Sequence, residues 1–167
     1  QDGKIIAAEM DIIGDGGAYA YSSTLVLGNA VLMSVGPYEI PNVKVDARVV
    51  HTNHVPGGAF RGFGGPQGTF AAESQVNRLA EKLGKDSVEF RLNNLVEDES
   101  LLSVGTPLPA GVTIKAVVRK LAERTAWPPN PSAAKMSSKN HIKHGIGIAC
   151  GFKNVGFSFG APEYCTA

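Results

Sequence analysis

The sequence is poor in the features that would mark a disulfide framework, a nucleic-acid surface or a membrane span. Its two cysteines, Cys150 and Cys165, are too few for a disulfide framework, so we expect reduced thiols in a cytoplasmic protein. Sixteen Lys and Arg against fifteen Asp and Glu leave a net charge of +1, too little for a nucleic-acid partner. No apolar run approaches the ~18 residues of a membrane-spanning helix. These absences leave a globular protein of ordinary charge.

The composition permits a buried core. Hydrophobic residues make up 43% of the 167 residues, which suits one domain or a large piece of one. The chain opens in an Asp2-Gly3 turn without an initiator methionine and stops just after an apolar stretch. We therefore expect residues 1–167 to be an incomplete piece of a larger domain.

Two segments alternate apolar and polar residues, which is the pattern of half-buried strands. The first covers residues 6–12, and we expect the glycine-rich residues 14–17 to end it. The second covers residues 43–49. Residues 18–40 contain many apolar side chains without a clean period, whereas the apolar, glycine-studded residues 145–152 favour a strand, a loop and another strand.

The middle of the chain has the periodicity of helices. The first predicted helix has an apolar face that Gly84 ends, made by Ala72, Val76, Leu79 and Leu83. Asp86 followed by Glu89 predicts the N-cap of a short second helix, whose buried face would be Val88, Leu92 and Leu95. A third helix, capped by Thr113, would have the apolar stripe Ile114, Val117, Val118 and Leu121.

Prolines stop the third helix, and the polar residues 128–142 are expected to form a mobile surface linker. Strands on both sides of a central group of helices predict an α+β fold with mixed strands.

Neither H-x-x-H pair predicts a metal site. His51 and His54 follow a strand, along which residues three apart point to opposite faces. His141 and His144 lie in a lysine-bearing polar stretch, and no cysteine or carboxylate cluster completes a ligand set. We therefore expect no metal ligand among these side chains.

The most distinctive segment is the loop at residues 57–67, in which five of eleven residues are glycine and Arg61 stands between two phenylalanines. Glycine clusters allow positive φ angles or a close approach of the backbone to another group. Gln67 replaces the third glycine of a G-x-G-x-x-G pattern, so a nucleotide site is disfavoured. We interpret the segment as a loop folded over a ligand and opening into a helix. The alternative is a packing loop in a non-catalytic structural or binding module.

Residues 59–67, A-F-R-G-F-G-G-P-Q, resemble a motif of the molybdenum hydroxylases, the xanthine dehydrogenase and aldehyde oxidoreductase family. Further similarities follow in the order of that family: D-G-G-A-Y at 15–19, I-P-N-V at 40–43, R-L-N-N-L at 91–95 and G-I-G-I-A at 145–149. The resemblance implies a partial molybdopterin-binding domain of a large subunit. It also implies an oxidoreductase that hydroxylates an aromatic N-heterocycle or an aldehyde with oxygen from water.

The resemblance implies roles for individual residues. Phe60, Arg61 and Gly62 would bind the molybdenum cofactor, whereas Phe63 and Phe159 would bind the two faces of a planar substrate. No catalytic residue is expected in this segment, because the general-base glutamate of the family lies nearer the C-terminus of its subunit. The 2Fe-2S clusters and FAD would belong to other segments or subunits, so the segment alone should be inactive.

Two departures from the family pattern bear on the substrate. Enzymes that act on xanthine carry an arginine in the region where this chain has Leu27-Gly28-Asn29-Ala30, and a threonine in place of Gly160. We therefore expect xanthine to be a poor substrate.

Overall fold

The computed structural model describes residues 2–127 and 146–153. Within them lie the strands β1 (Ala7–Gly17) and β2 (Asn42–His51) and the helices α1 (Ser23–Met33), α2 (Gly65–Lys82), α3 (Ser87–Asn94) and α4 (Ile114–Arg124). The α+β prediction is confirmed. The linker expected at 128–142 lies outside the described residues. No helix in the described part of the chain is long and apolar enough to cross a membrane.

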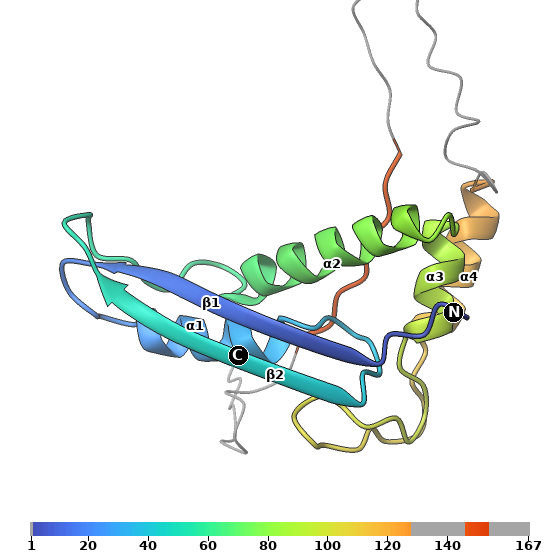
Figure 1. Ribbon diagram of the computed structural model, residues 1–167, viewed down its shortest axis with the longest axis horizontal. Helices are drawn as coiled ribbons and strands as arrows, with labels where there is room; N and C mark the ends of the chain where they lie inside the picture. The colour runs from blue at the N-terminus through green and yellow to red at the C-terminus, as the bar shows by residue number, and fades with distance from the viewer. Residues whose placement is uncertain (1, 128–145, 154–167) are drawn as a thin grey trace, which may run out of the picture.

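The two strands form a parallel pair, with Ala7 opposite Asn42 and Gly14 opposite Val49. A parallel pair requires a crossover connection, and α1 supplies it. Figure 1 shows the strands side by side, with α1 behind them, α2 above, and α3 and α4 gathered at the end where β1 begins. Both predicted strands are present, but residues 14–17 do not end the first one. They continue to pair with β2, and the only irregularity in this register lies between Asp15 and Gly17.

The two faces of the sheet differ in chemistry. Ala8, Met10 and Val43 point inward and pack against the core. The other face carries ion pairs between Glu9 and Lys44 (2.9 Å) and between Asp11 and Arg48 (3.1 Å), all of them exposed. Exposed pairs of this kind contribute about 0–1 kcal/mol each. The inward apolar residues therefore stabilise the strand pair more than the ion pairs do.

Helix α3 begins as predicted. The Asp86 carboxylate accepts hydrogen bonds from the backbone amides of Val88 (2.8 Å) and Glu89 (3.0 Å). An N-cap of this kind contributes about 1 kcal/mol. The buried core around α3 contains Val35, Tyr38, Ile40, Val76, Ala80, Val88, Phe90, Leu95, Val118 and Cys150.

Three expectations from the sequence need correction. Residues 18–40 contain α1, which the search for periodicity missed because its apolar side chains are spread around the helix. The stripe predicted for α4 is wrong in part, since Val117 and Leu121 are exposed and Val118 is the buried residue. Residues 146–153 form neither helix nor strand, although Ile148 and Cys150 pack against the core.

Helices α1 and α2 approach closely at two glycines. A Cβ at Gly64 would lie 2.2 Å from the carbonyl oxygen of Val26, and one at Gly68 would lie 2.5 Å from that of Ala30. Carbon atoms do not approach backbone oxygens so closely, so only glycine permits this contact. Part of the glycine content of the loop region therefore serves helix packing.

We predict that Gly68→Ala destabilises the protein by about 1–3 kcal/mol, because the added methyl group forces α1 and α2 apart. Gly28→Ala is the matched control, since a Cβ there meets nothing within 4 Å and removing a helical glycine stabilises by about 0.5–1 kcal/mol. Apparent melting temperatures of the two variants and the parent protein test this. Equal increases for both alanine variants would contradict the packing argument.

Candidate functional site

The glycine-rich loop forms two successive tight turns at the start of α2. The Phe63 amide donates to the carbonyl oxygen of Phe60 (2.7 Å), and the Gly65 amide donates to that of Gly62 (2.9 Å). Gly62, Phe63 and Gly64 have φ angles of 94°, 51° and 87°, so three consecutive residues are left-handed. Glycine adopts this conformation without strain, whereas for Phe63 it is uncommon. The loop opens directly into α2, as the sequence predicts.

Helix α1 and Ser22, the residue before it, hold the loop through three polar side chains. The Ser23 hydroxyl donates to the carbonyl oxygen of Gly57 (2.6 Å), and the Ala59 amide donates to the Ser22 hydroxyl (2.9 Å). The buried Asn29 amide donates to the carbonyl oxygen of Phe63 (2.6 Å). Sequence reasoning missed these residues. Their signal was the presence of hydrogen-bonding side chains in an otherwise apolar helix.

Asp15, near the end of β1, hydrogen-bonds to residues that follow the end of β2. One carboxylate oxygen accepts from the Thr52 hydroxyl (2.6 Å) and the Gly17 amide (2.9 Å), and the other lies 2.5 Å from Nδ1 of His54. The Thr52 hydrogen bond, followed by those of Gly17 and His54, lowers the pKa of Asp15 to about 2. The His54 ring is therefore a hydrogen-bond partner of the Asp15 carboxylate. Among the described residues no group of three His, Cys, Asp or Glu could hold a metal ion.

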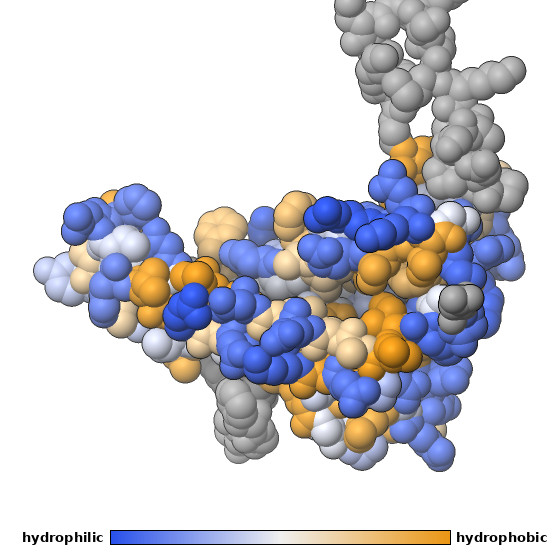
Figure 2. All heavy atoms as spheres, in the orientation of Figure 1, coloured by the Kyte–Doolittle hydropathy of each residue, from blue (hydrophilic) through white to orange (hydrophobic). Residues whose placement is uncertain are grey.

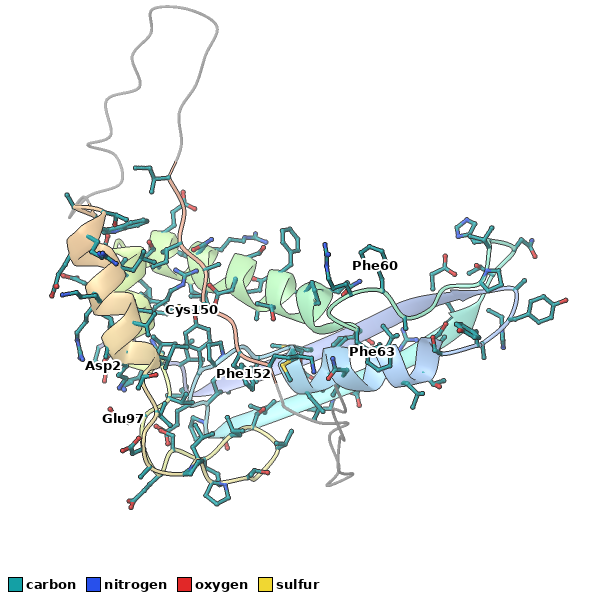
Figure 3. All side chains as sticks on the ribbon, turned by 180° about the vertical axis from the view of Figure 1, so that it is seen from behind. Asp2, Phe60, Phe63, Glu97, Cys150 and Phe152 are labelled. Atoms are coloured by element: carbon teal, nitrogen blue, oxygen red, sulfur yellow. The ribbon has the colours of Figure 1, made fainter. Side chains whose placement is uncertain are left out.

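The first turn of the loop contains an unusual set of donors. Phe60 is 79% exposed and stands out from the loop in Figure 3, and Arg61 is exposed beside it. Within the described part of the chain, the backbone amides of Phe60, Arg61 and Gly62 donate no hydrogen bond, and Arg61 forms no ion pair. Successive amides without a partner in the described chain, next to a guanidinium group, suit an anionic or oxo group. The donor set therefore fits the phosphate and oxygen atoms of a molybdenum cofactor.

The structure describes four of the five predicted site residues. Phe60, Arg61 and Gly62 lie in the first turn, and the half-buried Phe63 follows, its carbonyl oxygen bound by Asn29 of α1. Phe159 lies outside the described residues. Beneath the loop is a hollow of about 360 Å³, lined among others by Asp15, Ser23, Leu27, Val49, Gly64 and Gln67.

A wider groove of about 630 Å³ runs between β1 and α2, where Figure 2 shows apolar side chains. It is lined mainly by apolar residues such as Met10, Ile12, Val76 and Leu79. The free donors lie on the loop and not in this groove. The chemistry of the loop, more than the size of the groove, thus marks the candidate site.

Comparisons with known proteins identify the family of this chain. The family model of the molybdopterin cofactor-binding domain matches residues 1–95. The chain belongs to the molybdenum hydroxylase family. It is 39% identical over 124 residues to the nicotinate dehydrogenase large molybdopterin subunit of Eubacterium barkeri, covering 74% of this chain and 29% of the relative. It is 36% identical to an aldehyde oxidoreductase of Megalodesulfovibrio gigas, covering 93% of this chain and 17% of the relative.

Solved structures give the same result. The aldehyde oxidoreductase from Desulfovibrio desulfuricans matches 74% of this chain and 14% of its own, with a TM-score of 0.67 and 34% identity. Quinoline 2-oxidoreductase from Pseudomonas putida matches 75% of this chain and 16% of its own, with a TM-score of 0.63 and 34% identity. The chain thus spans less than a third of the length of each of these relatives.

We predict that the contribution of Asp15 to stability depends on pH in the acid range. Because folding lowers its pKa from 3.8 to about 2, the contribution is present above pH ~4 and is lost as the pH falls to about 2. Asp15→Asn should therefore be less stable than the parent at neutral pH, with a difference that disappears between pH ~4 and ~2. Urea unfolding across this range measures the difference. In a Thr52→Val background the loss should move to higher pH, and a difference that does not vary with pH would contradict the assignment.

Proposed function

We propose that the turn at Phe60–Gly62 contacts the molybdenum cofactor of an oxidoreductase that hydroxylates an aromatic N-heterocycle or an aldehyde with oxygen from water. The observation that carries the proposal is the run of three backbone amides that donate no hydrogen bond within the described residues, beside Arg61, which forms no ion pair there. The cofactor, when bound, supplies the centre that takes two electrons from the substrate. The amides would donate to its anionic oxygens, and the guanidinium group would add positive charge.

Phe63 and Phe159 are proposed to bind the two faces of a planar substrate. Phe63 follows the free amides directly, so a ring stacked on it would lie close to the cofactor. The described chain stops at Lys153, whose Cδ would lie 3.7 Å from a Cβ at Gly65, two residues from Phe63. Only five residues separate Lys153 from Phe159. The names nicotinate dehydrogenase and quinoline 2-oxidoreductase, borne by two relatives, support a planar heterocycle as the substrate class.

Further parts of the enzyme are proposed on the same basis. Residues 1–167 would belong to a larger molybdopterin-binding subunit, which partners with iron–sulfur and flavin units in the cytoplasm. This segment would not support turnover by itself. The alternative, a non-catalytic packing module, gains from the close contacts of Gly64 and Gly68 with α1. It offers no reason for the free amides or for the exposed Phe60 and Arg61.

We predict that Arg61→Ala abolishes most turnover without unfolding the protein, because Arg61 is exposed and makes no ion pair within the described chain. Arg78→Ala, at an exposed position on α2, is the matched control. Molybdenum content, turnover and melting temperature should be measured together. Full activity with normal metal content in Arg61→Ala would refute the role of this loop.

We predict that Phe63→Ala raises the KM for nicotinate or quinoline about tenfold while the KM for acetaldehyde changes little. Loss of one stacking face removes contact area that only a flat substrate uses, and tenfold corresponds to about 1.4 kcal/mol. Phe70→Ala, on the exposed face of α2, is the control. Unchanged selectivity in Phe63→Ala would contradict the proposed substrate site.

Xanthine should be turned over poorly, because the Asn29 side chain is hydrogen-bonded to the Phe63 carbonyl oxygen and no arginine lies near Asn29 in the sequence.

A further inference from the structure

Glu73 of α2 and Arg91 of α3 form an ion pair inside the protein. The Arg91 side chain is completely buried and donates from Nε (2.9 Å) and Nη2 (2.7 Å) to one carboxylate oxygen of Glu73. The other oxygen accepts from the Tyr38 hydroxyl, whose pKa is raised by burial and by the neighbouring carboxylate. The oxygen bound to Arg91 also accepts from the backbone amide of Cys150 (2.9 Å). A main-chain group from a distant segment thus belongs to this buried network.

That segment runs along α2 toward the glycine-rich loop. Cys150 meets Glu73, a Cβ at Gly151 would lie 3.7 Å from Cγ2 of Thr69, and Lys153 lies beside Gly65. Glu73 to Gly65 is about 12 Å of helix at 1.5 Å per residue, and Cys150 to Lys153 is about 10 Å of extended chain. The two lengths agree, so the segment is extended and antiparallel to α2. Figure 1 shows it passing behind α2 toward α1.

We propose that Glu73 is a positioning residue for the substrate site. Its carboxylate fixes the register of residues 146–153 along α2, and thereby the point at which the segment reaches Gly65, two residues from Phe63. This inference rests on the proposed function of Phe63 and extends it to a buried residue that touches neither substrate nor cofactor.

A directional contact is needed because apolar packing alone sets the register loosely. Ile148 and Cys150 pack against the core, but such contacts are not directional. A slip by one residue would move the segment ~3.3 Å and turn its side chains to the opposite face. The buried Cys150 amide would then lose its acceptor, which costs free energy. The Glu73 carboxylate therefore favours one register.

The test compares two variants that differ only in whether position 73 offers an acceptor. In a Tyr38→Phe/Arg91→Met background, Glu73→Gln keeps an oxygen for the Cys150 amide, whereas Glu73→Leu does not. Neither leaves a buried charge unpaired, and apolar replacements of buried ion pairs are often tolerated. Hydrogen exchange of the Cys150 amide, measured in the whole enzyme, should be at least tenfold faster with Leu than with Gln. Equal exchange would overturn the inference.

A second pair covers the case in which this background does not fold. Glu73→Asp keeps the charge beside Arg91 but withdraws the carboxylate, so faster exchange at Cys150 is expected. Tyr38→Phe removes a donor from the other oxygen and should leave that exchange slow. Equal exchange in these two variants would likewise overturn the inference.

The functional readout separates this inference from the proposed function. The Leu variant should raise the KM for nicotinate or quinoline about tenfold over the Gln variant, with an unchanged KM for acetaldehyde and equal molybdenum content. Faster exchange with an unchanged heterocycle KM would refute the positioning role, provided that Phe63→Ala does change selectivity. If Phe63→Ala leaves the substrate selectivity unchanged, the proposed substrate site is wrong. The exchange rate of the Cys150 amide then tests only whether Glu73 fixes the register of residues 146–153.

Discussion

The buried contact between Glu73 and Arg91 is the interaction on which the rest of the described structure depends. It joins α2 to α3, and through Tyr38 and the Cys150 amide it adds the connection before β2 and the segment at 146–153. Removing one partner of such a pair costs about 3–5 kcal/mol, because the other charge stays buried. Four parts of the chain, distant in sequence, are therefore arranged around one carboxylate.

Asn94 joins the N-terminal segment to α3 by hydrogen bonds. Its side-chain amide donates to the carbonyl oxygens of Gly3 and Phe90, and its oxygen accepts from the Ile5 amide. Arg91 and Asn94 are three residues apart and thus share one face of α3. The R-L-N-N-L segment of the family resemblance consequently has a structural explanation in this chain: both polar side chains point inward and join neighbouring segments.

The glycines of the loop have two different roles, helix packing and turn conformation, which cannot be distinguished from the sequence alone. Gly64 and Gly68 let α1 and α2 touch, whereas Gly62 adopts the positive φ of a turn in which three amides donate no hydrogen bond within the described chain. Helix α1 then fixes the loop through Ser22, Ser23 and Asn29. A turn held in this way can keep its donors in place without reorganisation, which is the requirement for binding an anionic group firmly.

Local sequence patterns predict the two strands, the helix after the glycine-rich loop, the Asp86 cap and the position of the loop, because each depends on residues close together in the chain. These patterns do not reveal α1, whose apolar residues surround the helix, nor which side of α4 is buried. Three sets of contacts become visible only in the folded chain: Asn29 with Phe63, Asp15 with His54, and Glu73 with Arg91 and Cys150. These contacts join residues 18 to 77 positions apart. Local sequence patterns do not predict such contacts, because the partners come together only when the helices and strands pack.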